Sequence, residues 1–576
     1  MRAINHSKSV AALALGLLCL LFMVSGCSGG SGNGASTSKT YISVQVSGTI
    51  RYEDKEYGAY GFTGNTRYKA VRYAVVDLVG ADDRVIDTTV SDENGFYELQ
   101  GTGPDPRVRV MAQTSDTAGA MIAINDFSGS TYAVAASPGN VTVTDSVTDG
   151  AINQPLDFDI STDSNIAGAF NMLDVYTSAA QFVSELTTAP LPRLNVYWQN
   201  QSSDYGTYYC SGTRQYSACP RGKGIYILGG RSGGGDSDHY DDDVLFHEFA
   251  HYVEGMVGVQ DSPGGVHYLT ENDQDLRLTW SEGLGGFFPA AVKTWLAQNH
   301  PQLLSIADGL PPTYFVDTYG SYVGISLDVA NPNTVFCPWG NDCYVYSSSE
   351  IAVAKILLGL MDKFGMQAIW DIYANYMASG TDLPGTLETF WDGWQAQRSP
   401  DALELAAADA VFNDRLVFYQ DDRYESDNHL AGNNMSHKLS VCADVTCNGE
   451  THYLYHGGGA DRDVVPFDAT TGQSYFIETL ELSNGADTFI RILDASGNVV
   501  VDQNGKLMTN DDRPGTVYCG TYDNSCRIHN DDLMLSSELT FTPPRGGTYY
   551  VEVTTSSTRP AAAGRYGTYT LQISKL

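Results

Sequence analysis

The stretch DDDVLFHEFAHYVEG, residues 241–255, places the strongest constraint on the fold, because it carries two histidines and a glutamate at the spacing H-E-x-x-H. On an α-helix, residues four apart lie on one face, so His247 and His251 can bind the same metal ion. Glu248 is then close enough to act on a water molecule at that ion. The apolar neighbours predict a buried helix, and buried imidazole and carboxylate groups need partners. The stretch therefore predicts a metal site; the alternative is two histidines that share a helix without a ligand.

Both ends of this helix can be predicted. Asp241, Asp242 and Asp243 precede the apolar run, and carboxylates stabilise the N-terminal end of a helix. Gly255 follows the run, and glycine commonly ends helices. We therefore expect a helix over residues 241–255 that the aspartates cap.

A catalytic zinc site needs a third protein ligand and an open position. The metzincin pattern has a histidine six residues after His251, but position 257 is valine, which excludes that class. The stretch LTWSEGLGGFF, residues 278–288, offers Glu282 instead. Ser281 can cap a helix that begins there, which would place Glu282 in its first turn. Three competing carboxylates lie in a polar loop: Glu271, Asp273 and Asp275.

The stretches DDVLFHEFAH and WSEGLGGFF together resemble the gluzincin class of zinc metallopeptidases, the thermolysin-like group. The resemblance implies that His247, His251 and Glu282 bind zinc and that Glu248 is the general base. It also implies that residues 224–230, GIYILGG, form an edge strand that pairs with an extended peptide substrate.

One position departs from the pattern of this class. Relatives often carry an aspartate one turn after the glutamate ligand, where it supports a zinc-bound histidine, but this chain has Gly286 there. Carboxylates that orient metal ligands are worth roughly 10- to 100-fold in affinity or activity. Either another carboxylate replaces the aspartate or the site is weakened. Gly285 and Gly286 would in turn let the two helices approach closely.

A peptidase of this kind also needs a donor that stabilises the oxyanion of the transition state. Tyr346 precedes a helix that we expect over residues 349–364, and relatives often place a Tyr-Ser segment there. Tyr346 is therefore the expected donor, with Tyr344 and His267 as competitors.

The periodicity of apolar residues changes twice along the chain. Before about residue 160 and after about residue 420, alternation of apolar and polar residues between turn signals predicts strands. Between these limits, helical spacing predicts helices such as residues 167–186. The expected fold class is a multidomain protein, with an α+β zincin-like peptidase domain flanked by N-terminal and C-terminal β-sandwich domains. The expected boundaries are residues 41–160 for the first β-sandwich, in one or two parts, 161–418 for the peptidase domain and 419–576 for the second β-sandwich.

Segments in both flanks resemble known β-domains. SDENGFYEL, residues 91–99, resembles the ending of carboxypeptidase regulatory-like repeats. DASGN at 494–498, NDD at 510–512 and GGTYYVEV at 546–553 resemble the bacterial pre-peptidase C-terminal domain. Such domains assist secretion or substrate contact and are not catalytic themselves. The acidic residues 510–512 could also bind Ca²⁺, although no full ligand pattern is present.

Residues 1–26 have the form of a secretory signal, with Arg2 and Lys8 before the apolar run VAALALGLLCLLFMV. VSGC ends at Cys27 and resembles the bacterial lipobox, in which the cysteine becomes the lipidated first residue of the mature chain. Residues 27–40 are rich in glycine and serine and would form a flexible tether. We therefore expect an exported protein that a lipid anchors to a bacterial membrane, at the outer membrane or the cell surface.

The remaining cysteines agree with export, because they fall into four close pairs and would form disulfides in an oxidising compartment. A cysteine metal site is the alternative. The expected disulfides are Cys210–Cys219, Cys337–Cys343, Cys442–Cys447 and Cys519–Cys526. The formal net charge of −35 argues against nucleic acid as a partner.

These features predict a zinc metalloendopeptidase with Zn²⁺ as its cofactor and proteins or peptides as substrates. It would hydrolyse peptide bonds by metal-activated water, with Glu248 as the base. The alternative hypothesis is a peptidase-fold lipoprotein that is weakened at Gly286 and acts as a surface binding or structural module.

Overall fold

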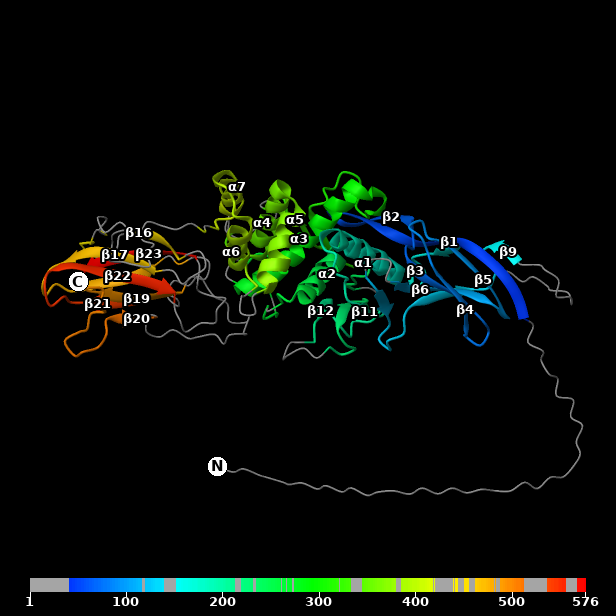
Figure 1. Cartoon of the computed structure of the whole chain (residues 1–576), viewed down its shortest axis with the longest axis horizontal. Helices are drawn as coiled ribbons and strands as arrows, with labels where there is room; N and C mark the ends of the chain where they lie inside the picture. Colours follow the sequence, from blue (N-terminus) through cyan, green and yellow to red (C-terminus); the bar gives the residue numbers. More distant parts are fainter. Residues whose placement is uncertain are drawn as a thin grey trace, which may run out of the picture.

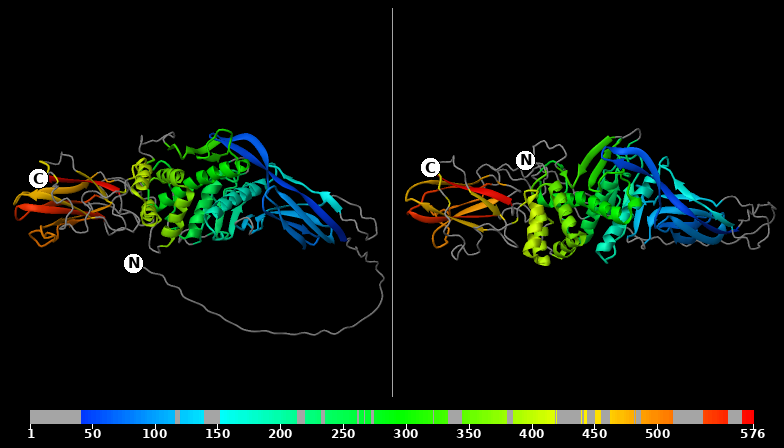
Figure 2. Two further views of the ribbon diagram at one scale, coloured as in Figure 1. Left: turned by 45° about the horizontal axis from the view of Figure 1, so that its top comes forward. Right: turned by 90° about the horizontal axis from the view of Figure 1, so that it is seen from above.

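The structure is a computed structural model that describes residues 41–115, 120–138, 152–212, 219–231, 235–260, 262–265, 267–271, 274–320, 322–332, 344–379, 385–417, 419, 439, 441–443, 450–454, 462–480, 482, 487–511, 536–555 and 567–576. Figure 1 shows these residues as three regions in a row, with strands at both ends and helices in the centre, and both views in Figure 2 keep this order. The architecture is therefore multidomain and rich in β-structure.

The N-terminal region is organised around one long strand, β1 (Tyr41–Gly58), which belongs to two layers. Its first half pairs with β5 (Phe96–Pro104) and β9 (Ile152–Pro155). Its second half pairs with β2 (Gly61–Ala70) and β10 (Phe158–Ile160). A tight turn precedes β5. Gly95 in that turn has φ 77°, and a Cβ there would lie 2.4 Å from the carbonyl oxygen of Ile50, so only glycine fits.

A second, eight-stranded sheet continues from the N-terminal region into the centre of the molecule. Seven of its strands form the order β12 (Tyr208–Cys210), β13 (Gly224–Ile227), β11 (Leu194–Trp198), β7 (Ile122–Asn125), β6 (Arg107–Thr114), β3 (Ala74–Val79) and β4 (Val85–Val90), and β8 (Ala133–Ala136) pairs with β6. One cluster of buried apolar residues extends from Val44 to Tyr419. The boundary expected at residue 160 therefore separates neither two sheets nor two cores, because β7 joins β6 to β11.

Seven α-helices are described, and they form the centre of the molecule in Figure 1. They are α1 (Ala167–Leu186), α2 (Asp242–Val257), α3 (Leu276–Asn299), α4 (Glu350–Phe364), α5 (Met366–Asp371), α6 (Leu387–Arg398) and α7 (Ala402–Asn413), with short 3₁₀ or π turns at Pro301–Leu303, Ile372–Tyr376 and Met377–Ser379. α2 packs against α3, and α3 against α4. The helix predicted over residues 167–186 is α1.

The ends of α2 and α3 differ from the prediction. α2 continues past Gly255 and ends at Gly258, which has the left-handed φ of 91° that the helix end requires. α3 begins at Leu276 rather than at Ser281, because the side chain of Asp275 accepts a hydrogen bond from the backbone N–H of Arg277. Glu282 therefore lies in the second turn of α3.

The aspartates before α2 also have a different role from a helix cap. Asp241 makes no side-chain cap hydrogen bond. Its carboxylate accepts from Thr318, and Asp243 accepts from the backbone N–H of Val316 at 2.9 Å and pairs with Lys293 at 2.5 Å. These aspartates attach the start of α2 to other elements.

Thr318 and Val316 belong to a hairpin that the sequence analysis did not anticipate, β14 (Tyr314–Tyr319) and β15 (Tyr322–Asp328). Phe315 is paired with Leu327, and Asp317 with Ile325. Because side chains alternate along a strand, these four residues share one face of the hairpin.

The C-terminal region is a β-sandwich with its own core. One sheet has the order β16 (Glu450–Leu454), β23 (Gly567–Lys575), β18 (Tyr475–Leu480) and β21 (Glu538–Phe541), and the other β17 (Arg462–Ala469), β22 (Gly547–Thr555), β19 (Thr488–Leu493) and β20 (Thr509–Asn510). Apolar residues of both sheets form one buried cluster, which begins at Leu439.

Several sequence predictions fall on residues outside the described ranges. These are the signal and tether in residues 1–40 with Cys27, position 512 and Cys337, Cys343, Cys447, Cys519 and Cys526. Cys210 and Cys219 form a disulfide, and Cys442 is also disulfide-bonded. None of the described helices combines the length and the hydropathy that a membrane span requires.

Candidate metal centre

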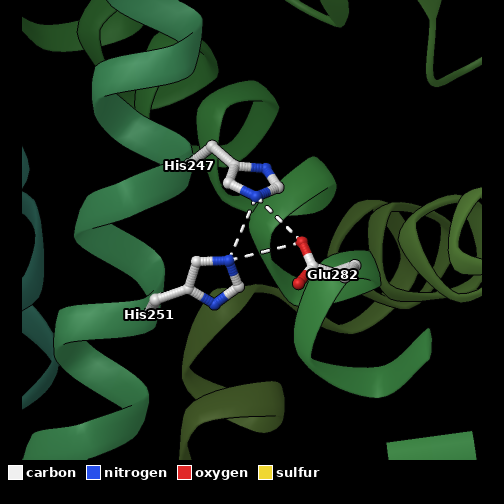
Figure 3. A group of neighbouring side chains, drawn as sticks. All are labelled: His247, His251 and Glu282. Atoms are coloured by element: carbon white, nitrogen blue, oxygen red, sulfur yellow. Dashed lines mark hydrogen bonds and ion pairs between the residues drawn. The ribbon is translucent and has the colours of Figure 1, made fainter. Parts of the chain in front are cut away.

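Three side chains converge between α2 and α3, as Figure 3 shows. The Nε2 atoms of His247 and His251 lie 3.1 Å apart. Oε2 of Glu282 lies 3.1 Å from Nε2 of His247 and 3.4 Å from Nε2 of His251. Zinc bonds of roughly 2.0–2.1 Å in a tetrahedron separate ligand atoms by about 3.3 Å, so the three atoms have the spacing of a zinc site.

The chemistry of these atoms also fits a cation. A neutral imidazole has one N–H, and two Nε2 atoms that face each other at 3.1 Å and share one carboxylate oxygen cannot all be satisfied by hydrogen bonds among themselves. A metal ion accepts all three lone pairs. Nitrogen and carboxylate ligands of this kind suit zinc.

Glycine allows α3 to lie this close to α2. A Cβ on Gly285 would lie 2.5 Å from Cε1 of His247, so any larger residue would displace the imidazole. A Cβ on Gly286 would instead meet Ala354 at an ordinary contact distance of 3.5 Å. Of the two glycines expected to permit close approach, only Gly285 is required for it.

Glu248 lies beside the three candidate ligands and is buried. Burial raises the pKa of its carboxyl above the usual value, although the nearby His251 and His247 oppose this. Its Oε2 atom has no hydrogen-bond partner in the described part of the chain. The side chain thus has a free oxygen and an increased affinity for a proton.

The two histidines differ in what holds their other ring nitrogen. Nδ1 of His251 lies 3.2 Å from Oγ of Ser281 and 3.5 Å from Oε2 of Glu254, and Ser281 donates to Glu254 at 2.6 Å. Burial alone would lower the pKa of His251, but Glu282 and Glu254 raise it well above its usual value. Glu254 is a supporting carboxylate that the sequence analysis missed.

Nδ1 of His247, in contrast, is buried and has no hydrogen-bond partner among the described residues. Gly286 lines the same cavity but offers no side chain. No carboxylate of the described residues therefore supports this nitrogen of His247.

The structure places His267, rather than Tyr346, beside the site. Nε2 of His267 lies 3.7 Å from Oε2 of Glu282, and its Nδ1 lies 2.8 Å from Oε2 of Glu350. Burial opposes protonation, but the hydrogen bond to Glu350 raises the pKa of His267 to about 9. Tyr346 does not line the cavity; its backbone has a left-handed φ of 69° and its N–H donates to the carbonyl of Arg415. Tyr346 as the donor stays a prediction, and His267 is the competitor that lines the cavity.

Tyr344, Glu271 and Asp275 are not among the described residues that line the cavity. Tyr344 packs in a small apolar cluster with Leu327 and Ile351. Asp275 caps α3, Glu271 does not line the cavity, and position 273 lies outside the described residues. Glu282 is thus the carboxylate of this group that lies next to the histidines.

The strand expected to pair with substrate is not a free edge. β12 covers β13, with Tyr208, Tyr209 and Cys210 in register with Tyr226, Ile225 and Gly224. Beyond β13, the N–H of Gly229 donates to Ser202 and its carbonyl accepts from Gln201. The backbone of residues 224–230 is therefore already paired within the chain.

Two of the candidate ligands, His247 and Glu282, line a cavity of about 300 Å³. Its lining includes Glu248, His267 and Glu350, and also residues of the β14–β15 hairpin. A cavity of this size beside a candidate metal centre is typical of a small-molecule or side-chain binding site.

Comparisons with known proteins give structural similarity alone. No family model matches the chain, and no curated protein matches it. Solved structures similar to it include the precursor of protealysin, a metalloproteinase from Serratia proteamaculans, at 12% identity over 52% of this chain and 88% of that chain, with a TM-score of 0.31. The pre-peptidase C-terminal domain of a Bacillus anthracis collagenase is 17% identical over 22% of this chain and 89% of that chain, with a TM-score of 0.14.

A third similar structure is CorA, a surface-associated copper-binding protein of Methylomicrobium album BG8. It is 13% identical over 24% of this chain and 94% of that chain, with a TM-score of 0.14. At these TM-scores the function has to be argued from the residues of the site.

Proposed function

We propose that this protein is an exported zinc metallopeptidase of the gluzincin type that hydrolyses peptide bonds in protein or peptide substrates. The observation that carries the proposal is the convergence of His247, His251 and Glu282 at spacings of 3.1–3.4 Å, with Glu248 in the same cavity. Three ligands with a cavity in front of them leave one coordination position for water or substrate.

Zn²⁺ would be held by Nε2 of His247, Nε2 of His251 and a carboxylate oxygen of Glu282. When bound, it supplies a Lewis acid that lowers the pKa of water and polarises a carbonyl group. Glu254 and Ser281 orient His251 for this role through its Nδ1 atom.

Side chains of the protein carry out the remaining catalytic steps. Glu248 takes the proton of the attacking water on its free Oε2 atom and then passes it to the nitrogen of the leaving amine. His267, which Glu350 keeps protonated and oriented, donates from Nε2 to the oxygen that becomes negatively charged in the transition state.

The location of the enzyme is part of the proposal. Cys27 would carry a lipid that anchors the chain to a bacterial membrane, at the outer membrane or the cell surface, with residues 27–40 as a tether. The anchor would keep the peptidase near proteins outside the cytoplasm. Calcium at residues 510–512 stays a prediction.

A second candidate is a peptidase-fold lipoprotein that binds or supports other surface proteins without cleaving them. The unpartnered Nδ1 atom of His247 beside Gly286 favours it, because a ligand without support binds metal less well.

The two candidates are separated by zinc content and proteolysis of the full chain and of Glu248→Gln. The peptidase proposal expects one zinc ion per chain in both proteins and cleavage of unfolded casein by the native chain alone, with a loss in Glu248→Gln of about 10³-fold or more. Glu282→Ala should lose zinc, whereas the matched Glu271→Ala should retain it. Bound zinc without cleavage of any peptide would leave the binding protein as the better candidate.

A further inference from the structure

The cavity beside the candidate metal centre has a wall that the proposed catalytic steps do not use. It is the face of the β14–β15 hairpin that carries Phe315, Asp317, Ile325 and Leu327. The ring of Phe315 lies 6.1 Å from that of His247. Asp317 is two residues further along the strand, which is roughly 7 Å farther on. The wall therefore runs from the metal centre to a carboxylate.

At Asp317 the wall meets two more carboxylates, which come from the segment before α2. One carboxylate oxygen from each of Asp236, Asp238 and Asp317 lies within 4.8 Å of the other two, and all three residues line the cavity. Mutual repulsion and burial raise the pKa of Asp238 to about 7 and that of Asp317 to about 6, with burial the larger cause. No lysine or arginine is among the described residues that line the cavity. The three carboxylates therefore have no lysine or arginine partner among the described residues that line the cavity.

Two buried oxygens in the same cavity, one of them on Asp236, point to a ligand. Oε1 of Glu350 has no hydrogen-bond partner among the described residues, although Glu350 is only 2% exposed. Oδ1 of Asp236 is likewise buried and unpartnered in the described part of the chain. Buried carboxylate oxygens without partners are costly, and a ligand that brings several N–H donors would satisfy them.

We propose that this cavity is a subsite for a long cationic side chain, a lysine or arginine of the peptide substrate that lies next to the bond to be cleaved. The methylene groups would pack on Phe315, Ile325 and Leu327, and the ammonium or guanidinium group would bind Asp236, Asp238 and Asp317. Long basic side chains bury their stems on apolar surface in this way while their charged ends bind carboxylates. The inference rests on the proposed function, because it names the substrate class of the same site.

The first experiment measures binding without cleavage. Zinc-loaded Glu248→Gln is titrated with two fluorescent peptides of glycine and alanine that differ only in a single lysine or norleucine, so that the stem is retained and the charge is removed. We expect the lysine peptide to bind at least about tenfold more tightly. Equal affinities would overturn the inference.

The carboxylates are then tested one at a time in the same background. Asp317→Asn and Asp238→Asn should each lower the ratio of lysine to norleucine affinity by about tenfold. Asp328→Asn is the matched control, because Asp328 belongs to the same hairpin, accepts from Thr313 and does not line the cavity. Its ratio should not change. Melting curves verify that each variant is folded, and an unchanged ratio in both test variants would overturn the inference.

Two other outcomes separate this inference from the proposed function. If the native chain cleaves proteins without preference for lysine or arginine, the subsite is wrong and the peptidase stands. If Glu248→Gln binds the lysine peptide selectively but the native chain cleaves nothing, the peptidase is wrong and the subsite stands. If Ca²⁺ raises the melting temperature of the native chain but not of Asp317→Asn, and the affinity ratio is near one, the carboxylates bind a metal and the inference is overturned.

Discussion

At the scale of single residues, the two histidines of the site differ in what holds their Nδ1 atoms. Glu254 and Ser281 support His251, whereas Nδ1 of His247 has no partner among the described residues. Support of this kind fixes the ring orientation and raises the basicity of a ligand. Glu254 therefore supports one of the two histidines, and the other has no supporting carboxylate among the described residues.

Gly286→Asp should strengthen the site by supplying the absent carboxylate. The position faces the cavity, and the nearest atom to a new Cβ is that of Ala354 at 3.5 Å, so the side chain can be accommodated. We expect zinc affinity, measured by competition with a chromophoric chelator, to rise by about tenfold. Gly286→Asn, which has the same size but no charge, is the control and should gain less. An affinity below that of the native chain in both variants would show that the position tolerates no side chain.

Where the signal is local, the sequence predicts which residues the structure brings together. The spacing of His247 and His251 on one helix and the nearby Glu282 follow from motif and helical periodicity. Glu254 could have been found in the same way, because it lies one turn after His251. His267 was named only as a competing donor, because a loop brings it to the cavity, and Asp317 could not be found, because a hairpin brings it there.

At the scale of elements, α2 is attached to the N-terminal region through a buried polar group at its start. Oγ of Ser305 lies 2.6 Å from Oδ2 of Asp242 and 2.7 Å from Oδ2 of Asp54, and it also accepts from Lys69 at 2.7 Å. A hydroxyl has one proton and can donate to one of the two carboxylates at most. The other contact needs a protonated acid, and burial together with Asp54 raises the pKa of Asp242 to about 7.

The protonation of Asp242 predicts how stability depends on pH. The folded chain holds this proton up to about pH 7, whereas a free aspartate loses it near its ordinary pKa of 3.8. The stabilising contribution is therefore complete below pH 3.8 and is lost as the pH rises towards and through 7. Between pH 5 and pH 8 the free energy of unfolding should fall on the order of a few kcal/mol more in the native chain than in Asp242→Asn, which keeps a neutral side chain.

Urea unfolding of the zinc-free proteins at several pH values would measure this difference, since zinc binding itself depends on pH. Asp82→Asn, at an exposed position, serves as the control and should follow the native curve. Parallel curves for the native chain and Asp242→Asn would contradict a shared proton at the start of α2.

At the scale of the whole molecule, the two β-rich ends relate differently to the helical centre. The eight-stranded sheet joins N-terminal strands to strands of the central region, and the N-terminal strands and the helices share one apolar core. The C-terminal sandwich has a core of its own. Sequence periodicity predicted strands at both ends but not this difference. Pairing between β7 and β11, which joins Ile122 to Leu194, is a long-range contact that local alternation of residues cannot specify.

Truncation should reveal this asymmetry. A chain that ends at residue 438 should fold and bind zinc with an affinity within about twofold of the full chain, because the core up to Tyr419 stays complete. A chain that begins at residue 161 should be insoluble, since it loses five of the eight strands of a continuous sheet and exposes apolar surface. Both truncated chains would be compared with the full chain by soluble expression, melting curves and zinc content. A folded chain that begins at residue 161 would contradict the shared core.

The long strand β1 has a mechanical consequence if the proposed lipid anchor at Cys27 holds the protein by its N-terminal end. Any pulling force applied through the segment before Tyr41 enters the body along β1, whose residues from Tyr41 to Thr49 are in register with β5 and from Val44 to Ser47 with β9. Because ladder hydrogen bonds lie across the strand, such a force shears many of them together instead of unzipping them one by one. The body should therefore resist tension from the direction of its tether, and the cavity should keep its shape while a bound substrate is pulled.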